Sequence, residues 1–139
     1  MAKEMIAETR LDYDGEKTES FFGKRPPIEL AGLSEMESKP LAWTPPHIYV
    51  AAIESCFLLT LLAVAGKMRM NIKSYSSEAE GKIVSSDGSH MEVSEVVIRP
   101  RVEIEGGADA GKTAKLFEMA KDYCLVARSV KTRIKIENP

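Results

Sequence analysis

The longest apolar run of the chain, Thr44 to Gly66, restricts the fold more than any other part of the sequence. Pro45 and Pro46 stand at its start, where a helix does not need their missing N–H groups. Gly66 followed by Lys67 supplies a stop signal and a cation for the negative end of the helix dipole. Because apolar residues occur on every side of this expected helix, at about residues 46–66, it must be buried in a protein core or in a bilayer.

A bilayer is the less favoured environment for this helix. About 20 apolar residues span a membrane, and the run from Ile48 to Ala65 comes close to that length. Glu54 lies near its centre, where a carboxylate in lipid would need a partner and a functional reason. We therefore predict a central core helix and no membrane partner. A single small domain can hardly bury such a helix completely, so we also predict a homodimer that shares it.

Length and charge restrict the class of protein further. The chain has 139 residues, which fits one domain. Its 19 lysines and arginines nearly balance 21 aspartates and glutamates. No basic patch suited to phosphates is visible, which disfavours a nucleic-acid partner. The first ten residues, MAKEMIAETR, contain no apolar signal core, so we expect a cytoplasmic location.

The part before the apolar run predicts a β-hairpin followed by loops. Residues 5–30 alternate loosely between apolar and polar side chains, and Asp14-Gly15 is a frequent hairpin turn. Residues 28–32 fit a third short strand. The prolines and glycines between residues 26 and 46 are typical of loops.

After the apolar run the pattern becomes extended. Residues 68–105 alternate with period two around an Asp-Gly turn at 87–88, which predicts a long antiparallel hairpin. Within this hairpin, Glu80-Gly81 suggests a β-bulge, and Pro100 suggests an edge position or a break.

The C-terminal part predicts a second helix and a short strand. Small and apolar residues recur at helical spacing over residues 108–124, and Asp109 is a suitable N-cap. The tail, 125–139, is expected to finish this helix and to close with a strand at 133–136. The outline is therefore α+β and rich in strands, with one buried helix and one amphipathic helix.

One short motif points to nucleotide binding but lacks the context for it. Residues 106–113, GGADAGKT, match the phosphate-loop pattern GxxxxGK[ST], in which Lys112 would meet phosphate and Thr113 would hold magnesium. Such a loop follows a buried parallel strand, whereas residues 102–105 alternate with charge, like a strand that has one wet face. No later apolar strand ends in an aspartate that could hold the metal. We interpret the motif as a flexible turn that leads into a capped helix, and we expect no cofactor.

Two cysteines, Cys56 and Cys124, are 68 positions apart. In a reducing cytosol a structural disulfide is improbable, so the pair is either inert packing or redox chemistry, and the counts alone favour inert buried thiols. With His47 and His90 far apart and no second cysteine pair, no metal-site spacing exists. His47 at the helix start fits a surface or capping role better than a catalytic one.

Several segments together resemble the OsmC and organic hydroperoxide resistance (Ohr) family. The likeness runs from about residue 44 to the end, whereas the N-terminal part agrees only in its hairpin-like outline. It rests on Pro45 to Cys56 with FLLTLLAVA after it, EAEG at 78–81, DG at 87–88, VVIRPRV at 96–102 and AKDYC at 120–124.

The resemblance implies an OsmC-like fold, in which antiparallel sheets wrap around a long central helix in an intertwined homodimer. One domain would cover residues 1–139. Its segments would be an N-terminal hairpin and loop (1–43), the central helix (44–67), an antiparallel hairpin (68–105), a second helix (108–124) and the tail (125–139).

The resemblance also implies an enzyme, a thiol peroxidase that favours organic hydroperoxides over small ones. Cys56 would attack the peroxide and form a sulfenic acid, and Cys124 would resolve it to a disulfide. A dithiol reductant would then restore both thiols. Phosphate-loop chemistry aside, the alternative is a non-enzymatic redox-sensing or small-molecule-binding protein on the same scaffold.

The attacking thiol needs a neighbour that keeps it ionised. Cys56 lies several turns inside its helix, so the dipole of that helix should help little, and a side-chain cation is expected. In the family this cation is an arginine of the N-terminal hairpin, for which Arg10 is our choice and Arg25 the runner-up. The family's orienting glutamate, ten positions before the cysteine, is Pro46 here. Glu54 could replace it, or could instead pair with a core arginine at the dimer interface.

Overall fold

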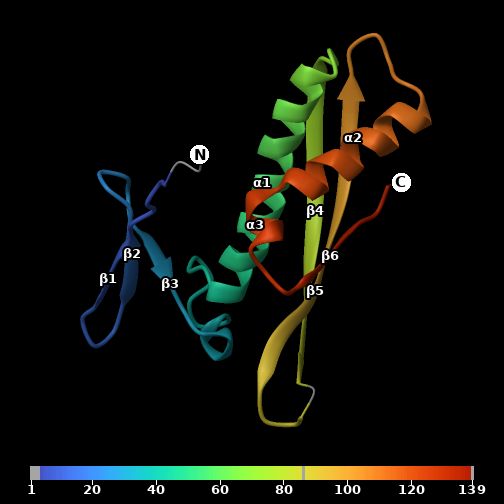
Figure 1. The fold of residues 1–139 in the computed structure, drawn as a ribbon. Coiled ribbons are helices and arrows are strands. Elements are labelled where there is room, and N and C mark those ends of the chain that lie inside the picture. Colours follow the sequence, from blue (N-terminus) through green and yellow to red (C-terminus); the bar gives the residue numbers. More distant parts are fainter. Residues whose placement is uncertain (1–3, 86, 139) are drawn as a thin grey trace. The chain divides into compact units, whose positions relative to one another are not determined.

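The computed structural model describes residues 4–85 and 87–138 and has an α+β architecture (Figure 1). The chain forms two compact units, Met1–Ile48 and Tyr49–Pro139. The first unit contains β1 (Arg10–Tyr13), β2 (Thr18–Phe21), β3 (Ile28–Leu30) and a 3-10 turn, η1 (Leu33–Glu35). Most of α1 (Pro45–Lys67) and all later elements belong to the second unit: β4 (Ile72–Ser85), β5 (Met91–Ile104), α2 (Ala110–Tyr123), α3 (Leu125–Arg128) and β6 (Arg133–Ile136).

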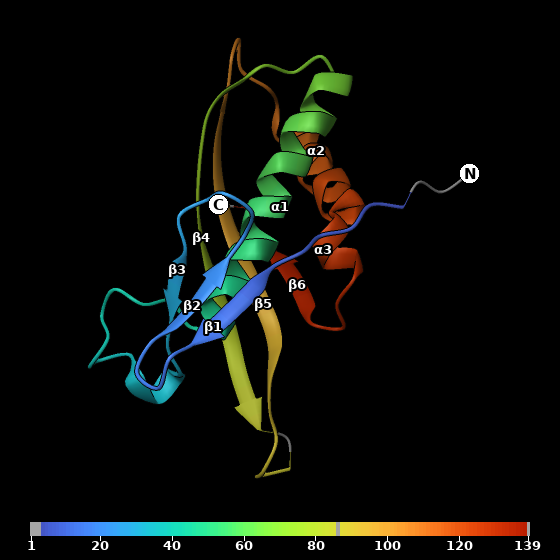
Figure 2. The same ribbon diagram turned by 90° about the vertical axis from the view of Figure 1, so that its left-hand side faces the viewer.

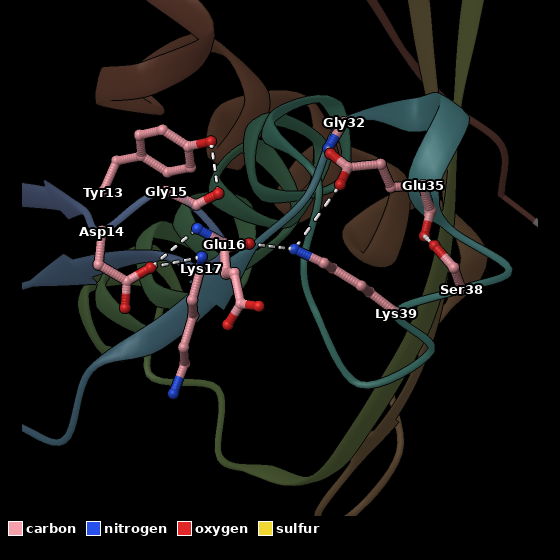
Figure 3. Close-up of polar contacts among 9 residues, drawn as sticks. All are labelled: Tyr13, Asp14, Gly15, Glu16, Lys17, Gly32, Glu35, Ser38 and Lys39. Atoms are coloured by element: carbon pink, nitrogen blue, oxygen red, sulfur yellow. Dashed lines mark hydrogen bonds and ion pairs between the residues drawn. The ribbon is translucent and has the colours of Figure 1, made fainter.

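The first unit is a three-stranded antiparallel sheet in the order β1-β2-β3, which confirms the predicted hairpin and third strand. Its first turn is fixed by Asp14, whose carboxylate accepts hydrogen bonds from the backbone N–H groups of Glu16 and Lys17 at 3.0 and 2.8 Å. Gly15 takes the left-handed conformation that this turn requires, with φ of 100°. The ammonium group of Lys39 donates to the Glu16 carbonyl at 2.8 Å and so holds the following loop (Figure 3).

Helix α1 confirms the helix predicted at about residues 46–66. The Thr44 hydroxyl, just before it, accepts the backbone N–H of His47 at 3.3 Å, as an N-cap does. By length and composition α1 could cross a membrane. One of its faces nevertheless forms the centre of the core with β5, β6 and α2. The buried residues on that face are Ile53, Phe57, Leu61, Val64 and Ala65.

Strands β4, β5 and β6 form a second three-stranded sheet, in which β4 and β5 are antiparallel and β6 runs parallel to β5. Helices α1 and α2 lie on the same side of β4 and β5 in Figure 2. The opposite face is polar and carries cross-strand ion pairs, such as Arg99 with Glu80 and Arg101 with Glu78. A sheet with one packed and one solvated face explains the alternation seen in the sequence.

The bulge predicted at Glu80-Gly81 is wrong. Gly81 pairs in register with Val96, and the irregularities of the ladder fall between Ile72 and Ser74 and between Lys82 and Ile83. The glycine has another cause, because a Cβ at position 81 would stand 2.6 Å from Cγ2 of Val50 on α1. Only a residue without a side chain allows the helix to approach β4 this closely.

Of the two alternatives given for Pro100, the edge position is confirmed, since β5 continues without a break but pairs only with β4 beyond Ile98. One further expectation needs correction. The second helix does not run on into the tail. It ends at Tyr123, and Cys124 takes an extended conformation (φ −66°, ψ 116°) before the short helix α3 begins.

Candidate active site

The two cysteines, far apart in the sequence, lie next to each other in the second unit. Cys56 is in the middle of α1 and half-buried, whereas Cys124, between α2 and α3, is only 1% exposed. Both thiols are free, and the two side chains are close enough for each to change the pKa of the other. Helices α1 and α2 contact each other through the rings of Phe57 and Phe117, whose centroids are 6.1 Å apart. The two cysteines are therefore neighbours, which does not fit their interpretation as two unrelated packing residues.

The surroundings of Cys56 favour its thiolate. Burial raises the pKa of this thiol, but the hydrogen-bond donors around the sulfur outweigh burial and place the pKa below its ordinary value. The largest lowering contribution comes from the backbone N–H of Val126, followed by the side chains of Cys124 and Thr60 and the backbone N–H of Leu125. The Thr60 hydroxyl donates to the carbonyl of Cys56 at 2.7 Å, and its oxygen lies 4.0 Å from the sulfur.

The surroundings of Cys124 disfavour its thiolate. Burial raises the pKa of its thiol, and the neighbouring Cys56 sulfur raises it further, because two thiolates side by side repel each other. The two pKa values thus move in opposite directions, so the surroundings favour ionisation of Cys56 over ionisation of Cys124.

The donors that stabilise Cys56 depend on the break between α2 and α3. Since α2 ends at Tyr123, the chain turns at Cys124, and the first N–H groups of α3 lack partners within that helix. The backbone N–H groups of Leu125 and Val126 in this first turn lower the pKa of the Cys56 thiol. These donors were not predicted, because a side-chain cation was expected on the ground that Cys56 lies several turns inside its own helix.

The predicted arginines both belong to the first unit. Arg10, on β1, forms an ion pair with Asp12, and its guanidinium lies 4.1 Å from the centre of the Phe21 ring. Arg25 is placed in the same way over Phe22, also at 4.1 Å. Each guanidinium is therefore oriented by an aromatic face, and that of Arg10 by a carboxylate as well.

The carboxylate of Glu54 is directed toward β4. It accepts a hydrogen bond from the hydroxyl of Ser77 at 2.6 Å. The pKa of Cys56, by contrast, is affected by groups of α3. The two side chains thus face different elements, as their spacing of two residues on a helix predicts. Pro46, at the position of the family's glutamate, is in the first turn of α1.

The phosphate-loop motif has a structural role. The carboxylate of Asp109 accepts the backbone N–H of Lys112 at 2.8 Å, so the N-terminus of α2 is already capped by an anion of the chain itself. The preceding strand, β5, is antiparallel to β4. Within residues 4–85 and 87–138, no three His, Cys, Asp or Glu side chains are arranged so that they could hold a metal ion.

The sequence of the chain matches a known protein family. The model of the OsmC-like protein family matches residues 37–138. The chain belongs to the OsmC-like protein family. This confirms the resemblance seen in the sequence, and it extends the match into the loop before α1. A search of curated sequences found no significant match.

Solved structures confirm the fold over the whole chain. An OsmC-like protein of unknown function from Vibrio cholerae has a TM-score of 0.86 at 22% identity, covering 98% of this chain and 100% of that one. An OsmC-like protein from Mycoplasma pneumoniae gives 0.84 at 9% identity, with coverages of 99% and 98%. The organic hydroperoxide resistance protein OhrB of Bacillus subtilis gives 0.78 at 14% identity, with coverages of 97% and 98%.

Proposed function

We propose that this OsmC-like protein is a thiol-dependent peroxidase that reduces organic hydroperoxides through Cys56 and Cys124. The observation that carries the proposal is the pair of neighbouring cysteines, in which Cys56 has a lowered pKa and Cys124 a raised one. Similar folds occur in proteins named for organic hydroperoxide resistance, from Bacillus subtilis and Legionella pneumophila.

The reaction would proceed in three steps. The Cys56 thiolate attacks the terminal oxygen of the hydroperoxide, an S–O bond forms as the O–O bond breaks, and the leaving alkoxide takes a proton to become an alcohol. The Cys124 sulfur then attacks the Cys56 sulfenic acid, which forms the disulfide and releases water. A dithiol finally reduces this disulfide by two thiol–disulfide exchanges and is itself oxidised. The partly exposed Cys56 is the member of the pair that a substrate reaches.

Arg10 is our candidate for the cation that stabilises charge at Cys56 during the attack. Its guanidinium is held by Asp12 and by the Phe21 ring, so Asp12 would supply the orientation that Pro46 cannot. Replacing Arg10 with Gln should lower kcat/KM by about tenfold or more, since removing one preorganised charge contact costs a few kcal/mol in the transition state. Arg25→Gln serves as the matched control, because Arg25 has the same charge and the same aromatic contact.

A homodimer in the cytoplasm completes the proposal. Many large apolar side chains of the single chain are exposed, both in the first unit and on α1, where Leu59 and Leu62 are 67% and 43% exposed. Exposed apolar surface of this extent marks an interaction surface. A second copy of the chain would cover it, with the sheets around the shared helix and residues 1–139 as one intertwined domain. Further exposed side chains are Leu11, Tyr13, Phe22, Leu41 and Trp43.

The alternative is a redox sensor or small-molecule-binding protein, and the absence of the family's glutamate at Pro46 favours it. Measuring catalytic turnover distinguishes an enzyme from this alternative. With cumene hydroperoxide and excess dithiothreitol, an enzyme consumes many equivalents of peroxide per chain. Cys56→Ser should abolish this activity, and Cys124→Ser should make it fade as Cys56 becomes over-oxidised. A wild-type protein that reacts only once, or a Cys56→Ser variant with full activity, would contradict the proposal.

A further inference from the structure

We propose that the cleft between α2 and β6 is a binding site for small organic anions with an apolar body. This cleft has a volume of about 330 Å³ and lies entirely in the second unit, on a different set of residues from the cysteine pair. Its α2 wall is formed by Ala114, Phe117, Glu118 and Lys121, and its other wall by Arg133, Ile134, Lys135, Ile136 and Asn138.

The charges around the cleft favour an anion. Three of the side chains that line it, Lys121, Arg133 and Lys135, are cationic, and among the described lining residues only Glu118 carries a carboxylate. This local excess of cations occurs in a chain whose net charge is −2, so it does not reflect the overall composition. Neighbouring cations of this kind raise the local concentration of anionic ligands.

These cations are weakly engaged by the rest of the protein. In the part of the chain that the structure describes, Lys121 forms no ion pair. Arg133 is 3.7 Å from Glu95, and its side chain is 77% exposed. Lys135 lies 3.6 Å from Glu137, but that carboxylate accepts a shorter contact from Arg99 at 2.7 Å. All three charges can therefore turn to a ligand at little cost in existing contacts.

The floor of the cleft supplies the apolar part of the site. Phe117 is 4% exposed and Ile134 is 8% exposed, and both belong to the core of the second unit. A volume of about 330 Å³ falls in the range of small-molecule sites, which are mostly apolar with a few placed polar groups. Arg133 and Lys135 alternate with Ile134 and Ile136 along β6, so the cations border the apolar floor and do not stand on it. An apolar floor with cations at its border matches a carboxylate or phosphate attached to an alkyl or aromatic body. Inorganic anions would contact the cations but not the apolar floor.

Calorimetric titration of the full-length protein tests this inference, with decanoate and 1-naphthyl phosphate as probes and acetate and inorganic phosphate as head groups alone. We expect one amphiphilic anion to bind per chain, at least about tenfold more tightly than its head group, since the buried body adds hydrophobic energy. Replacing both Lys121 and Lys135 with Gln should weaken binding by about tenfold or more. Ala114→Phe, at an exposed position of the cleft wall, should abolish it by filling the space.

Lys131→Gln is the matched control, because Lys131 is close in sequence, 88% exposed and outside the cleft. It should leave the affinity unchanged. Failure of both amphiphilic probes to bind at millimolar concentration would overturn the inference, as would binding that Ala114→Phe leaves intact. In those cases the cations would serve only to keep the edge strand β6 from pairing with other chains. None of these results depends on the peroxidase activity of the cysteine pair.

Discussion

The close approach of α1 to β4 at Gly81 yields a sharp test of the packing that holds the helix of Cys56 in place. A Cβ at position 81 would lie 2.6 Å from Cγ2 of Val50, whereas ordinary contacts of this kind begin at 3.4 Å. The valine cannot move aside, because a β-branched residue in a helix has one strongly preferred rotamer. In Gly81→Ala, either the helix or the strand must therefore shift by several tenths of an ångström.

The size of the effect follows from two opposing contributions. Overpacking in a well-packed region costs about 1–3 kcal/mol of the free energy of unfolding. Replacing a glycine that has an ordinary backbone conformation returns about 0.4–1 kcal/mol, because alanine restricts the unfolded chain. Gly81→Ala should therefore destabilise the protein by up to about 2.6 kcal/mol, the difference of the two contributions. In a Val50→Ala background the clash disappears, and the same substitution should become neutral or stabilising by up to about 1 kcal/mol.

Urea unfolding followed by circular dichroism measures all four proteins of this double-mutant cycle. One fixed protein concentration is needed, since association of chains would add to the apparent stability. The expected coupling between positions 50 and 81 is about 1–3 kcal/mol. If Gly81→Ala has the same effect with Val50 and with Ala at that position, the helix and the strand do not meet there and the described packing is wrong.

Two other substitutions test the site and the rejected motif. The rate of alkylation of Cys56 by iodoacetamide should show a pH midpoint below that of an ordinary thiol. Cys124→Ala should move this midpoint upward, because the Cys56 thiolate loses a hydrogen-bond donor. An unchanged midpoint would disprove the contact between the two side chains. Asp109→Ala should lower the free energy of unfolding by about 1 kcal/mol, since the N–H of Lys112 loses its cap. Magnesium ATP should leave the melting temperature unchanged, and a rise would revive nucleotide binding.

Much of the fold could be predicted from local patterns. The helix at 46–66, the turn at Asp14-Gly15 and the strand at 133–136 follow from capping residues, turn residues and periodicity, which act within a few neighbours. The prediction of a bulge at Gly81 was wrong because a strand can require glycine for several reasons. The reason here is the side chain of Val50, which is distant in the sequence.

The sequence could suggest candidate residues for the site but not the groups that surround them. The family resemblance selected Cys56 and Cys124, whose thiols influence each other's pKa in the structure, and their catalytic roles stay a prediction. The donors at Leu125 and Val126 could not be foreseen, because they exist only where α2 breaks at Cys124, and no proline or glycine marks that break. Contacts between residues some 68 positions apart depend on the packing of α1 against α2 and α3, which periodicity does not specify.

The most direct test of the account is the intact mass of the protein after addition of one equivalent of cumene hydroperoxide. If the two sulfurs are neighbours and Cys56 is a thiolate, each chain should lose two hydrogens, about 2 Da, and a dithiol should restore the original mass. Peptide mapping should then show Cys56 joined to Cys124 within one chain. A chain that gains oxygen at Cys56 without forming this disulfide, or does not react at all, would contradict the central claim.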